Sequence, residues 1–256
     1  MPRRIMVFTQ TYSNNRHRLF DYHDRDAVDI RFRNVFEKTV YAFHNSPADY
    51  IQDILRNHSY FQELDNLEVI RYDNMSYPES FRRTLQKCKA EGYDYMVFLQ
   101  DDVFSLGEGD AATHLDDLIS YIQTGDFKML HLENYVFKFE AEPETFSAPP
   151  VVHDNGAGFK VFASDSKHFE VSGQWAMDDG PFVAHIDFLL ELFDAKYFTF
   201  PTIWPAEGYI NEKVKLNPIV RYSASHKFFR RYNAVGPNDW NKVQEFGELD
   251  RLFSPT

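Results

Sequence analysis

The stretch "YDYMVFLQDDVFSL", residues 93–106, joins an apolar run to two adjacent carboxylates, Asp101 and Asp102. The run has the length and the β-branched and aromatic content of a buried strand, so the aspartates stand where that strand ends. A carboxylate removed from water without a partner is costly, so side chains in this position meet a cation, hydrogen-bond donors or solvent.

Strands and helices alternate along the chain that leads to this stretch. Ser46 and Pro47 are typical of a helix start at the beginning of residues 46–57, and Ser76 and Gly92 predict the two ends of another helix. Such alternation predicts right-handed crossovers and a mostly parallel sheet in an α/β fold. The predicted strands of this half are residues 4–12, 38–45, 67–74 and 93–100.

Polar residues follow these strands where each one ends. Ligands of open α/β sheets bind at the carboxyl ends of the strands, so we expect these residues to line one site. The polar residues at the strand ends are Thr9, Gln10, Thr11, Tyr12, Asn45, Asn74, Gln100, Asp101 and Asp102.

The second half of the chain has a mixed pattern. We expect a long strand over residues 127–140, a Pro- and Gly-rich functional loop over 141–158, and a strand over 159–164. Further on, the pattern predicts a helix over residues 183–194 and a strand over 219–223. A closing helix is expected near the C-terminal end, and nothing marks a linker between domains. We therefore expect a single domain over residues 1–256.

Composition limits the classes of function. The chain has 256 residues and a net charge of −12, with no run of Lys or Arg, which disfavours binding to the nucleic-acid backbone. Its single cysteine, Cys88, excludes an internal disulfide and a multi-cysteine zinc site. No signal peptide or membrane span is expected, since no segment approaches eighteen consecutive apolar residues; a cytoplasmic protein follows as the default.

The segment "YDYMVFLQDDVF" resembles the DxD region of the GT-A glycosyltransferases, which transfer sugars from nucleotide diphosphate donors. The preceding "VIRYDNMSYPESFRRTLQKCKAEG" is also similar to that family. The resemblance covers roughly the first 105 residues well and the remainder loosely. It implies a GT-A-like, Rossmann-like mixed sheet with flanking helices. Residues 1–105 would form a nucleotide-binding half and residues 106–256 an acceptor-binding half.

The resemblance also implies a divalent metal, Mn²⁺ or Mg²⁺, which neutralises charge on the departing diphosphate. In the family pattern the last aspartate falls on Asp102 as a metal ligand, and the first falls on Gln100, which keeps a hydrogen bond to ribose but brings no charge. Asp101 is a further candidate, and the family's late histidine falls on His226. The alternative is that the aspartates only cap the following turn.

The donor implied by the family is a nucleotide sugar, with uridine the commoner base among metal-dependent members. Thr9, Gln10, Thr11 and Tyr12 are the candidates for base and ribose contacts. Asn45 and Asn74 end the next two strands, and Arg82 or Arg83 is positioned on a helix to meet a phosphate. Each of these also has an ordinary interpretation as a strand-end or surface residue.

An inverting transferase needs a carboxylate that takes the proton of the acceptor hydroxyl. The family segment similar to "LFDAKYFTFPTIWPAEGYINEKVK" carries this role to Glu207, although Gly208 replaces the usual following aspartate. Asp178 and Asp179 compete for it, beside Trp175, which suits stacking on a sugar; they also fit as helix caps. The sequence thus favours an inverting glycosyltransferase with a glycan or other hydroxyl acceptor.

Two rival functions stay open. A non-catalytic carbohydrate- or nucleotide-sugar-binding module on the same fold would need no base, and Gln100 favours it. A metal-dependent phosphohydrolase would use Asp101 and Asp102, but "DDVFS" lacks the D-x-D-x-T pattern of such enzymes. A dinucleotide-binding dehydrogenase is excluded because "TQTYSNN" after the first strand has no G-x-G-x-x-G.

Overall fold

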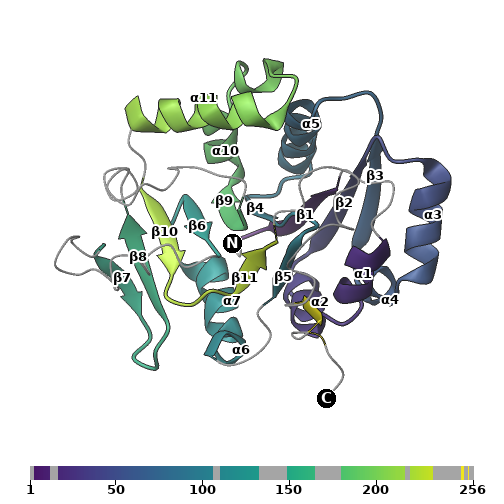
Figure 1. Ribbon diagram of the computed structural model, residues 1–256. Coiled ribbons are helices and arrows are strands. Elements are labelled where there is room, and N and C mark those ends of the chain that lie inside the picture. The colour runs from purple at the N-terminus through teal and green to yellow at the C-terminus, as the bar shows by residue number, and fades with distance from the viewer. Residues whose placement is uncertain are drawn as a thin grey trace.

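The structure is a computed structural model that describes residues 3–11, 17–105, 110–132, 149–164, 180–216, 220–232, 249–250 and 253. Within these ranges, nine strands form one sheet in the order β3-β2-β1-β4-β9-β6-β10-β8-β7 (Figure 1). Its strands are β1 (Ile5–Thr11), β2 (Lys38–His44), β3 (Leu67–Tyr72), β4 (Tyr95–Phe98), β6 (Met129–His131), β7 (Val151–Asp154), β8 (Lys160–Ser164), β9 (Phe182–His185) and β10 (Arg221–Ala224). A separate pair joins β5 (Val103–Ser105) to β11 (Phe229–Arg231) in antiparallel fashion.

The first four strands of the sheet are parallel, as the alternation predicts. β1 pairs with β2 on one side and with β4 on the other, and β2 pairs with β3. β9 then runs antiparallel between β4 and β6, while β6 and β10 are parallel to each other. The sheet is therefore mixed, and the carboxyl ends of β1, β2, β3 and β4 share one edge.

The helix predicted over residues 183–194 is wrong for its first residues. Phe182–His185 form β9, and α10 (Ile186–Leu192) begins only after His185. The strand is buried in the middle of the sheet, so its sequence is an unbroken apolar run rather than an alternating one. A short run of this kind has no period that separates a buried strand from a helix.

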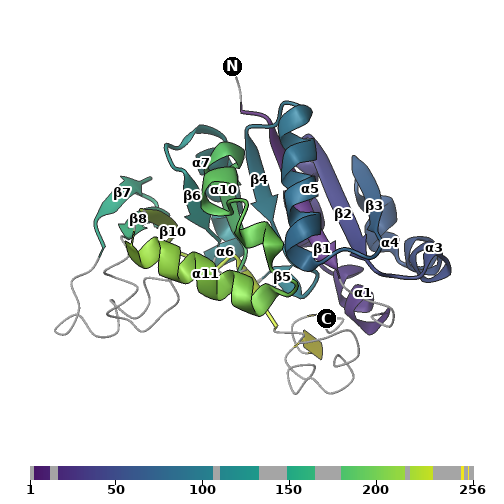
Figure 2. The same ribbon diagram turned by 90° about the horizontal axis from the view of Figure 1, so that it is seen from above.

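Helices cover both faces of the sheet (Figures 1 and 2). Met6 and Phe8 of β1 belong to the core beneath α5 (Tyr77–Ala90), α10 and α11 (Ile203–Leu216). Ile5 and Val7 point to the opposite face and pack with α2 (Ala27–Asn34) and α7 (Leu115–Thr124). The period of two in a strand thus divides β1 between two cores. The remaining helices are α1 (His17–His23), α3 (Ala48–Asn57), α4 (Ser59–Glu63), α6 (Asp110–Thr113) and the 3₁₀ turn η1 (Tyr197–Thr199).

The predicted ends of α5 are confirmed. The Ser76 hydroxyl accepts a hydrogen bond from the Glu79 amide at 3.2 Å, and Gly92 follows the helix with a φ of 80°. In α3 the predicted cap is wrong: the helix begins at Ala48, and Pro47 stands before it without a side-chain cap. The Ser46 hydroxyl instead donates to the His44 carbonyl at 3.4 Å, behind the helix start.

Two segments of the second half also differ from expectation. The predicted loop over residues 141–158 contains β7, which pairs with β8 through a turn around Gly156 and Gly158. The strand predicted over 127–140 is confirmed only as β6, since residues 133–140 lie outside the described ranges. Most of the predicted closing helix also lies outside them. No helix in the described part of the chain is both long and apolar enough to cross a membrane.

Candidate functional site at the carboxyl edge of the sheet

The ends of β1 and β4 bring the first group of predicted site residues together. The register pairs Phe8 with Phe98, so Gln10 and Thr11 lie beside the turn that carries Asp101 and Asp102. The Thr11 hydroxyl donates to the Asp101 carboxylate at 2.5 Å. Both aspartates are buried, with exposed fractions of 4% and 5%, so the turn is part of the fold rather than a solvated loop.

The aspartate turn, which carries Asp101 and Asp102, is stabilised by hydrogen bonds from residues that the sequence analysis did not single out. His23 donates from Nε2 to the Asp101 carbonyl at 2.8 Å. The Asp26 carboxylate accepts from the Ser105 amide at 2.8 Å and also from the Ser105 hydroxyl. Across the turn, the Tyr232 amide donates to the Asp102 carbonyl at 3.0 Å. The backbone of residues 101–105 is thus fixed by hydrogen bonds from three elements.

Burial sets the electrostatics of these supporting groups. Burial, with the nearby Asp29 charge second, raises the pKa of Asp26 to about 6. Burial lowers the pKa of His23, which is fully enclosed. Neither group is close to solvent, so their effect on the site is to position the turn.

A second buried network supports β1 itself. Arg33 donates to Asp29 at 2.7 Å and to the Thr9 hydroxyl at 2.8 Å, and Tyr60 donates to Asp29 at 2.8 Å. Thr9 is therefore committed to Arg33, although the sequence suggests it as a nucleotide contact. The charged residues of "DAVDIRFRN" recur at a spacing of three and four residues, which places Asp26, Asp29 and Arg33 on one face of α2. That spacing is the signal by which sequence reasoning would have found the network.

Gln10 and His44 meet at the start of α5. The Ser80 hydroxyl donates to the Tyr77 carbonyl at 2.9 Å, so it accepts from Gln10 Nε2 at 2.5 Å and from His44 Nε2. Burial lowers the pKa of His44 to about 4, which keeps its ring neutral. Gln10 is 2% exposed, and its buried Oε1 has no hydrogen-bond partner among the residues that the structure describes. An unsatisfied buried acceptor at this edge is the kind of group that a ligand N–H satisfies.

Glu207 lies on α11, more than a hundred residues later in the chain, and α11 packs against α5 and η1, which carry Tyr77 and Tyr197. Gln100 donates from Nε2 to the Tyr77 hydroxyl at 3.4 Å. Burial raises the pKa of Tyr77, and the neighbouring Tyr197, Glu207 and Asp101 add to the increase. Burial also raises the pKa of Tyr197, with the Glu207 charge as the second cause. Glu207 is therefore close enough to both tyrosines for its charge to act on them.

Trp204 is a further feature that the sequence analysis did not single out. It lies three residues before Glu207 on α11, so the two side chains share a helix face. Trp204 is 66% exposed, which is unusual for a residue of this size. An exposed aromatic ring beside a carboxylate is suited to contact with a sugar ring.

Asn45 and Asn74 are brought together by a structural role. Both have left-handed backbone conformations, with φ of 50° and 56°, which asparagine tolerates better than most residues. The Asn74 amide donates to the Asn45 side-chain oxygen at 2.7 Å, and the Asn45 amide donates to the Tyr72 carbonyl. The two residues thus link the ends of β2 and β3 by hydrogen bonds at the predicted edge.

The basic candidates on α5 point to other surroundings. Arg83 is exposed and donates to Glu79 at 3.2 Å, one turn earlier on the same helix. The Arg82 guanidinium lies 5.4 Å from the centre of the Phe198 ring. Neither observation brings an arginine to the aspartate turn.

His226 stacks on the His114 ring with the ring centres 4.6 Å apart, and its Nδ1 lies 2.9 Å from the Ser225 hydroxyl. β11 follows it, and the Asp102 carbonyl is bonded to Tyr232, six residues further along the chain. His226 thus contacts His114, the residue before α7, and its neighbour Ser225. Tyr12, Asp178 and Asp179 lie outside the described residues.

Adjacent buried carboxylates at a strand end fit a hard divalent cation. Mg²⁺ is usually bound by one or two carboxylates together with substrate phosphates and waters, rather than by a full set of protein ligands. Asp101 and Asp102 supply such a pair, and the described part of the chain does not add a third His, Cys, Asp or Glu ligand to it. The donor set therefore suits a metal that binds together with a diphosphate.

Comparison with known proteins gives a likeness of structure only. No protein-family model and no curated protein matches the sequence. The structure of S. aureus TarS 1-349 in complex with UDP matches 98% of the chain with a TM-score of 0.52 and 15% identity. A second structure of S. aureus TarS 1-349 gives a TM-score of 0.51 and 13% identity over 98% of the chain.

The chain spans 64% of the length of these TarS structures. Mannosyltransferase PcManGT from Pyrobaculum calidifontis, in complex with GDP-Man and Mn2+, matches 55% of this chain and 38% of that one, at 12% identity. Its TM-score of 0.38 is too low to support a shared fold. The TarS likeness and the topology together show a GT-A-like fold, with a mixed central sheet and helices on both faces.

Proposed function

We propose that this protein is a metal-dependent glycosyltransferase that takes a sugar from a nucleotide diphosphate donor. The observation that supports the proposal most is that Gln10 lies beside the Asp101–Asp102 turn at the carboxyl edge of the sheet, while the Glu207 charge raises the pKa of Tyr77, whose hydroxyl contacts Gln100. Residues 1–105 would bind the donor and residues 106–256 the acceptor. The UDP named with the TarS structure supports a uridine nucleotide.

In this proposal Asp102, with Asp101, holds Mn²⁺ or Mg²⁺. When bound, the cation would neutralise the negative charge of the departing diphosphate. The chain's own part is to position the two aspartates: Thr11 bonds the Asp101 carboxylate, and His23 and Tyr232 bond the backbone carbonyls of Asp101 and Asp102. Gln10 Oε1 would accept a hydrogen bond from the N–H of the nucleotide base, which its lack of a partner supports.

Glu207 would take the proton of the acceptor hydroxyl as the new glycosidic bond forms, which gives inversion at the sugar. Its place beside Tyr77 and Tyr197 supports this role, and the exposed Trp204 supports a sugar acceptor. Asp178 and Asp179 remain competing candidates for the base. His226 remains a proposal as a second metal ligand.

The test is a thermal-shift series with UDP, GDP, dTDP and CDP, each with and without Mn²⁺. A ligand at a hundred times its dissociation constant adds about 2.7 kcal/mol of stability, which is a measurable rise in Tm. We expect UDP to stabilise the chain only when Mn²⁺ is present. Stabilisation of equal size without metal contradicts the metal assignment, and no response to any nucleotide contradicts the donor site.

Asp102→Asn is the matched variant, since it keeps the shape of a buried side chain and removes its charge. It should lose the Mn²⁺-dependent part of the UDP shift and sugar transfer, with its own Tm changed little. Asp65→Asn is the control, because Asp65 is an exposed aspartate in the turn before β3, at the opposite edge of the sheet. Unchanged transfer in Asp102→Asn would remove Asp102 from the site.

A binding module without catalysis is the second candidate, favoured by Gln100 in place of a charged residue. Glu207→Gln separates the two functions. For a transferase this variant should bind UDP with Mn²⁺ normally and turn over at least about a hundredfold more slowly, the usual loss for a general base. A wild-type chain that binds the nucleotide but transfers no sugar supports the binding module.

A further inference from the structure

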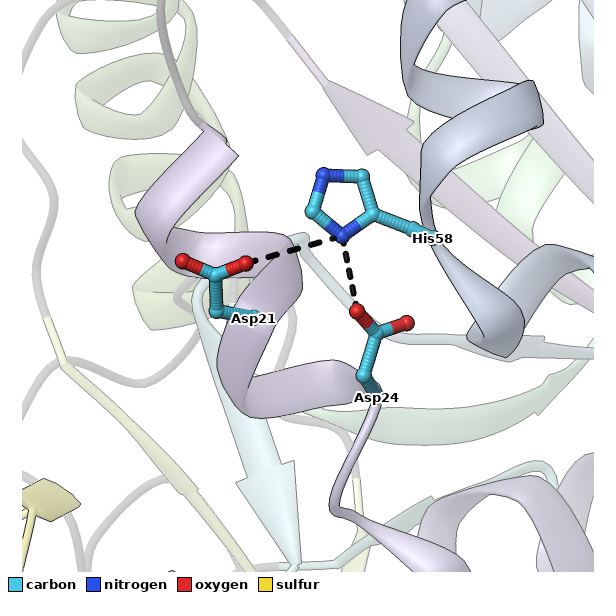
Figure 3. Close-up of side chains that lie close together, drawn as sticks. All are labelled: Asp21, Asp24 and His58. Carbon is cyan, nitrogen blue, oxygen red and sulfur yellow. Dashed lines mark hydrogen bonds and ion pairs between the residues drawn. The ribbon is translucent and has the colours of Figure 1, made fainter.

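A second group of ligating side chains lies away from the aspartate turn, where α1 meets the junction of α3 and α4. Asp21 is on α1, Asp24 directly follows that helix, and His58 stands between α3 and α4 (Figure 3). His58 Nδ1 lies 2.8 Å from Asp24 Oδ2 and 3.9 Å from Asp21 Oδ1. In the described part of the chain, this is the one group of three or more such residues whose ligand atoms converge.

The outer contacts of the group orient it toward a common centre. The second oxygen of Asp24 accepts from the Tyr60 amide at 2.9 Å and from the Ser59 hydroxyl at 3.4 Å. Asp24 Oδ2 is thereby left facing His58. Carboxylate ligands of metals are commonly held by hydrogen bonds of this kind.

The other nitrogen of His58 supplies an independent observation. His58 Nε2 lies 3.4 Å from His17 Nδ1, and His17 Nε2 lies 3.4 Å from Asp53 Oδ2. If His58 Nε2 donates to His17 Nδ1, then His17 Nε2–H faces the Asp53 carboxylate, and both of these contacts are favourable. This tautomer directs the Nδ1 lone pair of His58 toward Asp21 and Asp24.

A lone pair beside two carboxylates is repulsive unless a positive charge lies between them. A cation at Nδ1 makes the arrangement favourable, and the ligand atoms of Asp21, Asp24 and His58 all lie within 4.8 Å of one another. Histidine that binds a metal typically donates its other N–H in the manner seen here.

We propose that Asp21, Asp24 and His58 bind a divalent cation of the zinc class, with water completing the coordination. Tetrahedral zinc with bonds of about 2.0–2.2 Å places its ligand atoms roughly 3.4 Å apart. The observed separations of 2.8 Å and 3.9 Å from His58 Nδ1 lie on either side of that value, so small side-chain movements suffice. One imidazole and two carboxylates suit Zn²⁺ rather than Mg²⁺ or Ca²⁺, which prefer oxygen ligands alone.

The site is accessible and shares no ligand with the aspartate turn. The Asp21 side chain is 59% exposed, so a cation reaches the group from solvent while His58 anchors it from the interior. A bound cation would join α1 to the α3–α4 junction. This role is structural and does not depend on sugar transfer.

The test is a titration of the full chain with Zn²⁺ against a chelating indicator, in an Asp102→Asn background that removes the aspartate turn as a competing site. We expect one equivalent to bind, and Asp21→Asn to weaken binding at least about tenfold, because it removes a ligand without disturbing the interior. Asp49→Asn is the control, as an exposed aspartate on the first turn of α3, and should bind as the parent does. With Co²⁺ as the probe, the absorption of a tetrahedral ion should appear in the parent and be lost in Asp21→Asn.

Two further variants complete the test. Asp53→Asn should weaken Zn²⁺ binding by about tenfold or more through His17, the usual effect of an outer partner. His58→Gln should abolish binding, and Asp21→Asn keeps the test valid if that variant does not fold. Absence of stoichiometric binding, or binding that Asp21→Asn leaves unchanged, overturns the proposal and leaves the contact of His58 with Asp24 as a structural hydrogen bond.

Discussion

The Asp29–Arg33 ion pair is the most deeply buried charge pair among the described residues. Both side chains are 0% exposed, and their remaining contacts go to Thr9 and Tyr60. Neither charge is hydrated, so the free energy of burying one of them depends on the presence of the other. The pair ties α2 to β1 two residues before Thr11, the residue that contacts Asp101.

Removing one member of this pair should be far more costly than removing both. We expect Arg33→Leu to lower the free energy of unfolding by roughly 3–5 kcal/mol, because it leaves the Asp29 charge buried alone. The double variant Asp29→Leu/Arg33→Leu should be more stable than the single one, and urea unfolding of the full cycle measures this. Additive losses in the double variant would contradict a coupled pair.

Asp26 should make part of the stability depend on pH. Its pKa rises from 3.8 in the unfolded chain to about 6 in the fold, so the folded state holds a proton that the unfolded state has lost between these values. This contribution is fully present below pH 3.8 and is lost as the pH rises through about 6. The difference is on the order of 3 kcal/mol, since one pKa unit corresponds to about 1.4 kcal/mol.

Asp26→Asn isolates this contribution, because asparagine does not titrate. The free energy of unfolding of the wild type relative to the variant should fall between pH 4 and pH 6.5 and be constant above it. His44 acts in the opposite direction over much of the same range, since its pKa falls to about 4 and its contribution is lost as the medium becomes acidic. Comparison with the variant removes that effect. A parallel pH dependence of the two proteins would contradict the raised pKa of Asp26.

At the scale of elements, the hydrogen bond between Asn45 and Asn74 links the carboxyl ends of β2 and β3. Asn45→Ala removes the side-chain oxygen that accepts a hydrogen bond from the Asn74 amide. It also puts alanine, which tolerates a left-handed backbone less well than asparagine, at a φ of 50°. Asn45→Gly removes the same bond but suits the conformation, so we expect the Ala variant to be about 1 kcal/mol less stable than the Gly variant. Urea unfolding compares them directly. Equal stability would show that the backbone conformation at Asn45 is not strained.

Elements with a clear period and clear ends could be predicted from sequence. β1, β2, β3, β4 and α5 follow from apolar runs, from Ser76 and from Gly92, because their local preferences agree with the fold. β9 could not be separated from α10, since a buried strand has no alternation. α3 begins at Ala48, and Ser46 bonds back to the His44 carbonyl instead of capping the helix. The preference of serine for helix caps does not reveal which of these two bonds it makes.

The candidate site shows the same division. Strand-end residues such as Thr11 and Asp101 follow from the parallel order of the strands, and the structure joins them. The buried supports Asp26, Arg33 and His23 are charged or titratable residues that composition assigns to the surface. Their burial depends on partners distant in sequence, such as Ser105, which no local pattern specifies.

At the scale of the whole molecule, the proposed site depends on the packing of α11 against α5 and η1. Glu207 and Tyr77 come from segments more than a hundred residues apart, and α5, η1 and α11 carry them to one place. The core shared by these elements contains Phe81, Tyr197 and Ile210. A ligand that bridges donor and acceptor sides would therefore stabilise both at once.

Hydrogen–deuterium exchange with UDP and Mn²⁺ should reveal this link. With UDP we expect slower exchange at the aspartate turn and at the first turn of α5. UMP without metal is the control, since it lacks the second phosphate, and should protect these two regions less. UDP-sugar with Mn²⁺ should in addition slow exchange at the amides around Glu207 in α11, because the donor's sugar would lie between Asp102 and Glu207. Protection confined to residues 3–105 with every ligand would contradict a shared site and favour a nucleotide-binding module, because only the transferase requires the base on α11 to lie next to the bound donor.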